Sequence, residues 1–360
     1  MFLRRNKTSG TISGGKLRRI TRLAGSDGRF RMMAIDQRGS MQKAIQSATG
    51  EEATYEQVAK MKTMITRILS PNSTAVLTDP IFGYPYSIMD IPRDVGLLLA
   101  FEESGYVDDG VGENERASVQ IENWNIEKAI RSGIDAIKLL IYYHPDASLN
   151  ACSHQQDFTK YVGEQCEKYD LPFLLEFVCY SLDGESTNSL EFAKQKPDLV
   201  IRSVEEYTKP EYKVDILKVE FPANLKFVKE YKDRDFYMGA SAYTLSEVEE
   251  FCRDLDAKST LPWVILSAGV DIEEFIENVK ISSAHGASGF LCGRAIWKDA
   301  VPLYPDEDAV TKFLLGEASV NFENSNAAVS NATPWFNHKS FGGLKNIELD
   351  KKGANWYEAY

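Results

Sequence analysis

Eight short apolar runs, each followed by a longer polar segment, are the feature that most limits how this chain of 360 residues can fold. The runs lie at residues 32–37, 74–79, 96–102, 136–143, 173–180, 214–222, 263–269 and 288–294. Each has the length of a buried strand, and such strands alternating with helices indicate parallel strands that are covered on both faces. Eight is also the number of strands that closes a β/α barrel.

The segments between the runs have the pattern of amphipathic helices. In residues 55–69, apolar side chains recur every three or four positions, which predicts a helix with one buried face. Residues 123–133, 157–169, 246–254 and 271–284 are similar. An open doubly wound sheet would show the same alternation, usually with a Gly-x-Gly-x-x-Gly turn after the first strand. The first run here is followed by Asp-Gln-Arg-Gly instead, so we expect an α/β protein of the (β/α)8, or TIM-barrel, class.

We expect a single barrel domain over residues 16–321. Residues 1–15 are rich in Ser, Thr and Gly and predict a mobile N-terminal extension. Residues 322–360 have scattered aromatic side chains without a clear period, and we expect a tail that packs on the barrel or on a neighbouring subunit. The connection at 80–92 is rich in Pro, Tyr and Gly and is expected to pack over the barrel mouth.

Composition indicates an enzyme of the cytoplasm. The formal net charge of −12 argues against binding to nucleic acid, because a negative protein repels the phosphate backbone. No apolar run reaches the ~20 residues of a membrane span, and the N-terminal residues lack the apolar core of a secretory signal. The cysteines are odd in number and dispersed, which is typical of reduced thiols. Barrels of this kind often associate through their outer helices, so we expect a homo-oligomer.

Lys218 is the residue with the clearest chemical meaning. It lies in the apolar run at 214–222, and strand interiors rarely hold lysine because a buried ammonium loses its water. Burial favours the neutral amine, which can attack a carbonyl and form a Schiff base. The alternative is a strand-end lysine that reaches solvent or pairs with Asp215 or Glu220.

Other polar side chains end the predicted strands, where the active site of a β/α barrel lies. Lys138 and Glu176 lie inside apolar runs and are expected to converge with Lys218 on the barrel mouth. Buried charges are costly unless they are paired or used. The full set of candidate site residues in or just after these runs, polar side chains and turn glycines together, is Asp36, Gln37, Arg38, Asp79, Glu102, Lys138, Glu176, Lys218, Ser267, Gly269, Gly293 and Arg294.

Six segments together resemble the class I tagatose-bisphosphate aldolase family, which includes relatives that split sulfofructose phosphate. They are Met-Ala-Ile-Asp-Gln-Arg-Gly-Ser at 33–40, Ala-Ile-Lys-Leu-Leu at 136–140, Leu-Leu-Glu-Phe at 174–177, Asp-Ile-Leu-Lys-Val-Glu at 215–220, Leu-Ser-Ala-Gly at 266–269 and Gly-Phe-Leu-Cys-Gly-Arg at 289–294. The resemblance runs from about residue 20 to about residue 340 in the expected order. The N-terminal fifteen residues, the Tyr-Pro-Tyr loop at 84–86 and the tail after Gly343 depart from it.

The resemblance implies roles for four catalytic residues. Lys218 would be the Schiff-base lysine, and Glu176 would be the base that takes the C4 hydroxyl proton of a ketose phosphate. We expect burial to raise the pKa of Glu176 toward the working range of a base. Lys138 would either disfavour the charged form of Lys218 by repulsion or bind substrate hydroxyls, and Asp36 would orient a lysine or a hydroxyl. A structural ion pair is the alternative for Glu176.

Substrate binding is expected from both sides of the mouth. The turns that contain Ser267, Gly269 and Gly293 let backbone N–H groups approach a phosphate, and Arg294 adds a charged fork. The alternative for the two glycines is a purely structural role in tight turns. By resemblance, Gln37 contacts a hydroxyl and Arg38 meets the far phosphate. A structural hydrogen-bonding role at the strand end is the alternative for both Asp36 and Gln37.

The sequence thus predicts a class I aldolase that needs no cofactor or metal. Its substrate would be a phosphorylated ketose, tagatose 1,6-bisphosphate in the first place, with 6-deoxy-6-sulfofructose 1-phosphate as the nearest rival. A sugar-phosphate sensor and another Schiff-base enzyme, such as a dehydratase or transaldolase, are rivals of other kinds. The four histidines show no metal-ligand spacing, unlike the zinc site of class II aldolases.

Overall fold

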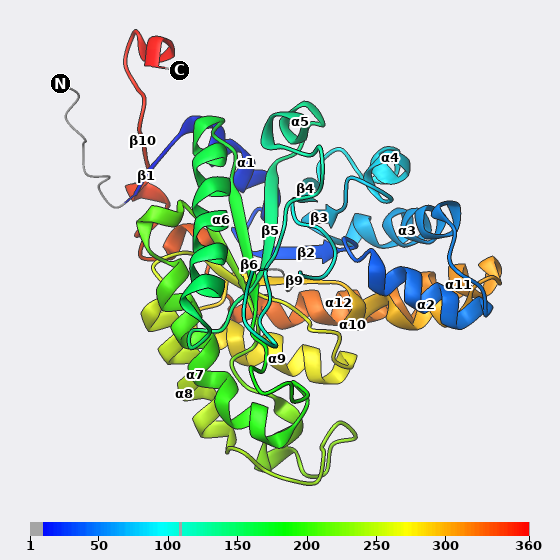
Figure 1. Cartoon of the computed structure of the whole chain (residues 1–360). Helices are drawn as coiled ribbons and strands as arrows, with labels where there is room; N and C mark the ends of the chain where they lie inside the picture. The colour runs from blue at the N-terminus through cyan, green and yellow to red at the C-terminus, as the bar shows by residue number, and fades with distance from the viewer. Residues whose placement is uncertain (1–9, 108–109, 360) are drawn as a thin grey trace.

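Eight parallel strands close into a barrel at the centre of the computed structural model, which describes residues 10–107 and 110–359 (Figure 1). Each strand pairs with its sequence neighbours, and the last pairs with the first. The strands are β2 (Phe30–Ala34), β3 (Ala75–Thr78), β4 (Gly96–Ala100), β5 (Ala136–Tyr142), β6 (Phe173–Val178), β7 (Ile216–Val219), β8 (Trp263–Ile265) and β9 (Gly289–Cys292). The predicted barrel fold is confirmed.

Helices surround the barrel, and several begin where the sequence supplies a cap. Thr54 and Thr244 each form a capping box with the residue three positions later, at the starts of α3 and α8. The helices are α1 (Gly14–Leu23), α2 (Gly39–Thr49), α3 (Tyr55–Leu69), α4 (Tyr84–Ser87), α5 (Ile126–Arg131), α6 (Leu149–Lys168), α7 (Leu190–Tyr207), α8 (Leu245–Lys258), α9 (Ile272–Ala284), α10 (Arg294–Trp297), α11 (Glu307–Phe313) and α12 (Ser319–Ala328).

The barrel interior is apolar toward the N-terminal ends of the strands and charged toward their C-terminal ends. Side chains two positions apart in a strand point to the same side. Leu174 and Ile216 belong to the buried apolar cluster inside the barrel, so Glu176 and Lys218 face the same interior two positions nearer the C-terminal ends. A second apolar cluster fills the space between the strands and the helices. The alternation therefore puts the charged groups at the mouth.

The two chain ends close the opposite, N-terminal end of the barrel. β1 (Thr11–Ile12) pairs in parallel with β10 (Glu348–Leu349), and Ser13 caps α1. Of the expected mobile extension, residues 1–9 lie outside the described residues, whereas 10–15 belong to this cover because their backbone is hydrogen-bonded.

The C-terminal residues expected to form a tail pack largely on the barrel. The expected boundary at residue 322 falls inside α12, and Phe322 is fully buried in the outer core. Trp335 and Phe341 belong to the apolar cluster inside the barrel and reach it at the N-terminal end of the barrel. Beyond β10 the chain extends away from the barrel and leaves Trp356 exposed (Figure 1).

The connection at 80–92 does not cover the mouth, contrary to expectation. Backbone N–H groups of Ile81 and Phe82 donate to the Asp79 carboxylate at 2.9 and 2.7 Å, which turns the chain outward. The segment then packs beside α3, where the rings of Phe82 and Tyr55 lie 5.0 Å apart. None of its residues lines the central cavity.

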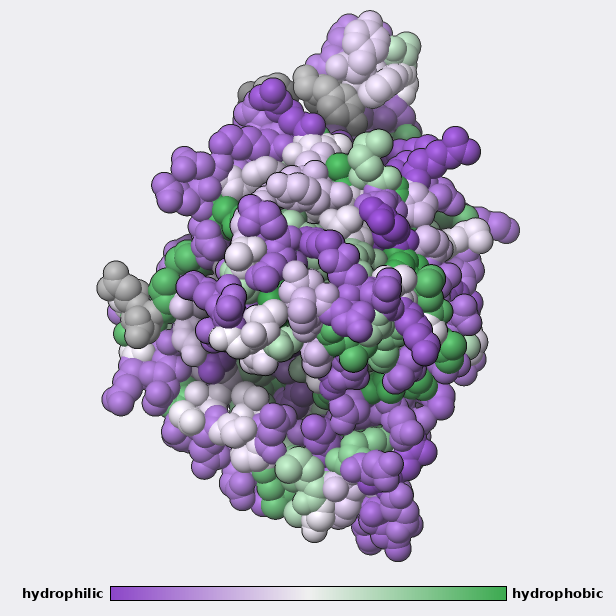
Figure 2. Space-filling model, turned by 90° about the vertical axis from the view of Figure 1, so that its right-hand side faces the viewer, coloured by the Kyte–Doolittle hydropathy of each residue, from purple (hydrophilic) through white to green (hydrophobic). Residues whose placement is uncertain are grey.

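The face of the molecule drawn in Figure 2 is mainly polar. Figure 2 shows one face of the molecule, on which hydrophilic side chains predominate and hydrophobic ones form separate patches. In the part of the chain that the structure describes, no helix combines the length and apolar character needed to cross a bilayer.

Candidate active site

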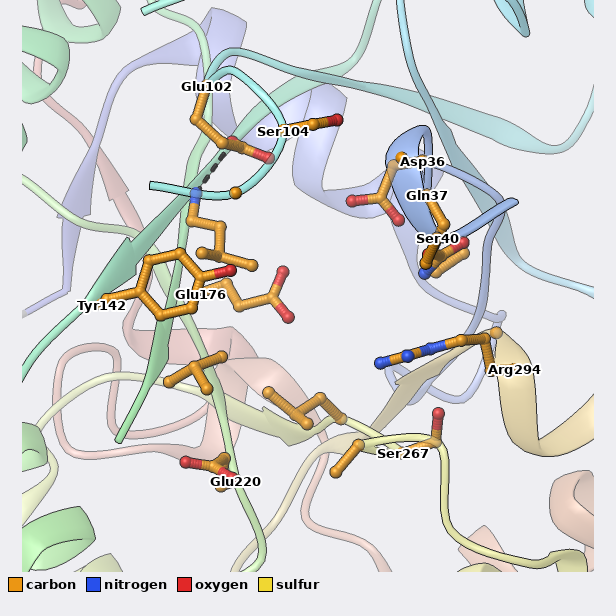
Figure 3. Close-up of a pocket in the computed structure, with 18 of the residues that line it drawn as sticks. Asp36, Gln37, Ser40, Glu102, Ser104, Tyr142, Glu176, Glu220, Ser267 and Arg294 are labelled. Atoms are coloured by element: carbon orange, nitrogen blue, oxygen red, sulfur yellow. Dashed lines mark hydrogen bonds between the residues drawn. The ribbon is translucent and has the colours of Figure 1, made fainter. Parts of the chain in front are cut away.

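A cavity of about 760 Å³ opens at the C-terminal ends of the barrel strands (Figure 3). Nine of the ten residues that the sequence singles out as catalytic or substrate-binding line it, and Gly269 is the exception. Gly269 directly follows the lining residue Ala268. These nine residues therefore converge on the barrel mouth, as predicted.

Lys218 and Glu176 form the centre of the site. They are direct partners in the register of β6 and β7, and Nζ of Lys218 donates to Oε2 of Glu176 at 2.9 Å. Only 3% of Lys218 and 6% of Glu176 is exposed. The amine and the carboxylate are thus held together out of bulk water, with one side open to the cavity.

Lys138 connects three carboxylates. Its Nζ lies 2.8 Å from Asp36, 2.8 Å from Glu102 and 2.9 Å from the same Glu176 oxygen that Lys218 contacts. The other Glu102 oxygen accepts from the backbone N–H of Leu140 at 2.8 Å, which fixes that carboxylate on β5. A network of hydrogen-bonded charges of this kind orders its members.

The network reverses the expected shift at Glu176. Burial by itself raises the pKa of the Glu176 carboxyl, but the ammonium groups of Lys138 and Lys218 outweigh burial and lower it. Asp36 is affected in the same way, and its pKa also falls below the ordinary value. The prediction of a raised pKa for Glu176 is therefore wrong, because it considered the apolar neighbours in sequence and not the lysines on adjoining strands.

Lys138 is the permanent cation of the site. Burial by itself would lower the pKa of Lys138, but the three surrounding carboxylates raise it well above the ordinary value. Burial raises the pKa of Glu102, although Lys138 and Arg38 oppose the shift. The positive charge of Lys138 is compensated by its carboxylates, which offsets the repulsion it would otherwise exert on Lys218.

Replacing Lys138 with methionine should lower the free energy of unfolding by about 3–5 kcal/mol, because buried carboxylates would lose their partner. Urea unfolding at pH 7 measures this change. Lys258→Met is the control, since it removes an ion pair with Glu205 whose side chains are 46% and 54% exposed, and it should have far less effect. A Lys138→Met variant as stable as the control would contradict a structural role for the network.

Asp79 faces away from the mouth. Its Oδ2 lies 2.5 Å from Nζ of Lys62 on α3, and both side chains are fully buried between the barrel and the helices. Lys62 also donates to the carbonyl oxygen of Ile35 at 2.6 Å. This strand-end carboxylate therefore anchors α3 and the start of the 80–92 connection.

Two acceptors at the end of β2 are unoccupied. Within the described ranges, Oδ1 of Asp36 and Oε1 of Gln37 are buried and have no hydrogen-bond partner. Buried acceptors are rarely left unpaired, and both residues line the cavity. These oxygens are suited to hydroxyl groups of a bound molecule.

The ends of β8 and β9 form the side of the cavity suited to an anion. Gly269 adopts a φ of +77°, which favours glycine, and a Cβ there would lie 3.3 Å from the Arg294 guanidinium. At Gly293 a Cβ would lie 2.4 Å from the carbonyl oxygen of Ala34. Ser267 and Arg294 line the cavity beside these turns (Figure 3). The two glycines thus let the backbone lie close to neighbouring groups on this side of the cavity.

Arg38 is partly engaged by protein groups. A terminal nitrogen donates to the carbonyl oxygen of Glu102, and Nη1 lies 3.6 Å from the Glu103 carboxylate. Only 6% of Arg38 is exposed, although the residue lines the cavity.

Several lining residues were not predicted as part of the site. Glu102 was recognised as a strand-end carboxylate, but its pairing with Lys138 depends on the register of β4 and β5. Arg116 lies in the long connection between β4 and α5, which has no period from which its position could be predicted. Ser104, Tyr142 and Glu220 also line the cavity. In the described part of the chain, no cluster of three or more His, Cys, Asp or Glu residues could hold a metal ion.

A (β/α)8 barrel with two buried lysines around one carboxylate at its mouth has the groups that aldolases use on carbonyl substrates. The comparison with known families agrees: residues 30–299 match the model of the DeoC/LacD family aldolases, and the chain belongs to that family. It is an aldolase.

Curated relatives match over nearly their whole length. The chain is 35% identical to the tagatose 1,6-diphosphate aldolase 2 of Enterococcus faecalis over 330 residues, 90% of this chain and 97% of the relative. It is 32% identical to the tagatose 1,6-diphosphate aldolase of Staphylococcus aureus strain JH9 over 332 residues, 91% and 99% of the two chains.

Solved structures share the fold at lower identity. The fructose-bisphosphate aldolase of Plasmodium falciparum is 13% identical, with a TM-score of 0.65 over 91% of this chain and 99% of its own. A Schiff-base-forming fructose-1,6-bisphosphate aldolase is 16% identical, with a TM-score of 0.52 over 85% and 99%.

Proposed function

We propose that this chain is a class I aldolase that cleaves D-tagatose 1,6-bisphosphate to dihydroxyacetone phosphate and glyceraldehyde 3-phosphate. The observation that carries the proposal is the buried contact of 2.9 Å between Lys218 Nζ and Glu176 Oε2 at the barrel mouth. The substrate is supported by the names of relatives that match nine-tenths of the chain.

The first stage would form an iminium on Lys218. The amine, after passing a proton to Glu176, attacks the C2 carbonyl carbon of the ketose, and the carbonyl oxygen becomes a hydroxyl. Loss of that hydroxyl with a proton as water leaves a C2=N⁺ bond. The positively charged nitrogen withdraws electrons from the neighbouring carbons and weakens the C3–C4 bond.

The second stage would break the C3–C4 bond. Glu176, as carboxylate, takes the proton of the C4 hydroxyl, the C4–O bond becomes a carbonyl, and the electron pair of C3–C4 moves to the C2–C3 bond. The aldehyde leaves and an enamine remains on Lys218. Protonation at C3 and hydrolysis of the resulting iminium release dihydroxyacetone phosphate and return the amine.

The surrounding residues would bind and orient the sugar. The free acceptors of Asp36 and Gln37 receive substrate hydroxyls. The ammonium of Lys138 holds Asp36 and Glu176 in place and favours their ionised forms. The C1 phosphate lies against Ser267, Gly293 and Arg294, beside the turn that contains Gly269, where backbone N–H groups and a guanidinium can surround its oxygens.

The substrate is tested by steady-state turnover of three ketose phosphates. We expect kcat/KM to be highest for D-tagatose 1,6-bisphosphate, lower for D-fructose 1,6-bisphosphate and lower for 6-deoxy-6-sulfofructose 1-phosphate. Preference for the sulfonate would assign the rival substrate with the same mechanism. Failure to cleave any of the three would contradict the proposed function and favour a sensor.

We infer the cellular compartment of the enzyme from its cysteines. In the described structure Cys152, Cys166, Cys179, Cys252 and Cys292 are all thiols, which fits a reducing cytoplasm. The homo-oligomer stays a prediction.

A further inference from the structure

Arg116 lies in a cage of three tyrosine rings at the edge of the cavity. Its guanidinium carbon is 4.5 Å from the ring centre of Tyr106, 4.9 Å from that of Tyr180 and 5.3 Å from that of Tyr142. Tyr142 ends β5, Tyr180 follows β6, and Tyr106 belongs to the connection after β4. Three separate segments thus fix one arginine, which lines the same cavity as Lys218.

The cage orients the positive charge without neutralising it. Aromatic faces attract a guanidinium through their quadrupole but carry no net charge. Within residues 10–107 and 110–359, no carboxylate lies within ion-pair distance of Arg116. A guanidinium held over ring faces still carries the N–H groups with which arginine binds phosphate. The guanidinium of Arg116 is therefore held in place with its charge and N–H groups available to bind an anion.

The position of the cage fits the far end of a bisphosphate. Figure 3 shows Tyr142 and Arg294 on opposite sides of the site, with Glu176 between them. If the C1 phosphate lies at Arg294 and C2 at Lys218, the sugar continues past Glu176 toward the Tyr142 side. A ketohexose bisphosphate carries its second anion at that end.

We propose that Arg116 is the specificity-determining residue for the C6 phosphate, an inference that rests on the proposed function. Arg38, the residue expected to meet the far phosphate, donates from one terminal nitrogen to the carbonyl of Glu102 and faces the Glu103 carboxylate, although its Nε and Nη1 are buried without a hydrogen-bond partner in the described ranges. Arg116 has neither kind of protein partner among the described contacts of its guanidinium. Because the Glu103 carboxylate already offsets part of the positive charge of Arg38, an anion gains more electrostatic attraction from Arg116.

The test compares kcat/KM for D-tagatose 1,6-bisphosphate with that for D-tagatose 1-phosphate. Arg116→Met should reduce this ratio about 30-fold, mainly through KM, since it removes a charged hydrogen bond to one substrate only. Arg116→Lys should reduce it about fivefold, because the charge stays and the fork is lost. Arg38→Met tests the rival residue, and the inference predicts that its ratio stays within about threefold of the native ratio. A ratio that falls in Arg38→Met and not in Arg116→Met would overturn the inference.

Borohydride trapping with dihydroxyacetone phosphate separates this inference from the proposed function. The trapped ketone has a C1 phosphate and no C6 group, so the native enzyme and Arg116→Met should both be labelled on Lys218. No label on the native enzyme would contradict the proposed function. Labelling of both with an unchanged substrate ratio would overturn the role of Arg116 alone. If Arg116→Met is not labelled, Arg116→Lys decides, and an unchanged ratio there also overturns it.

Discussion

Replacing Lys218 with methionine should lower the rate of tagatose 1,6-bisphosphate cleavage about 10⁴-fold or more, because a thioether cannot form the iminium. Methionine has a similar length and tolerates burial, so the barrel should fold. Initial rates in an assay coupled to the triose phosphate products measure the loss, and circular dichroism reports the fold.

Lys43→Met is the matched control. Lys43 lies on α2, lines the same cavity and is exposed, and it has no part in the proposed chemistry. We expect its rate to stay within about tenfold of the native rate. Cleavage by Lys218→Met at a rate near that of Lys43→Met would exclude a covalent role for Lys218.

Replacing Glu176 with glutamine should reduce kcat about 10³-fold, the range expected when a general base is lost. An amide cannot accept the C4 hydroxyl proton, whereas the amine of Lys218 can still react with a ketone. Rapid-quench measurement should therefore find covalent adduct with substrate that fails to break at C3–C4. The rate of cleavage within this adduct is the quantity to compare.

Glu220→Gln tests whether any carboxylate of the cavity would give this effect. Glu220 lines the same cavity just beyond β7, and its Oε2 accepts from the backbone N–H of Cys179 at 2.7 Å. Among the described contacts Glu220 pairs with Lys196 and with neither Lys138 nor Lys218, so we expect a change in kcat of less than about tenfold. Equal losses in the two variants would remove Glu176 from the role of base.

The positions of the proposed catalytic residues follow from the sequence to a large extent. Lys138, Glu176 and Lys218 each lie inside an apolar run, and neighbouring parallel strands bring such positions together. Two-residue alternation then turns all three side chains inward. This argument needs only strand direction and period, which local sequence provides.

Properties that depend on register between strands could not be predicted. The lowered pKa of Glu176 results from lysines on β5 and β7, and neither contact is visible in the segment around residue 176. The same holds for Glu102, whose two oxygens are used by Lys138 and Leu140. Electrostatic environment is a property of the assembled barrel.

Irregular connections were the other source of error. The Pro and Tyr residues of the 80–92 connection indicated a loop over the mouth, but the backbone bonds to Asp79 direct it to α3. The connection that contains Arg116 was not assigned to the site, because its contacts with Tyr142 and Tyr180 join segments far apart in sequence. α7 was not predicted either, and it holds Pro197 within its helical span.

The most direct test of the account is borohydride reduction in the presence of dihydroxyacetone phosphate, followed by peptide mass mapping. We expect one stable adduct, on Lys218, and none in Lys218→Met. An adduct on Lys138, or no adduct at all, would contradict the assignment of Lys218 as the Schiff-base lysine.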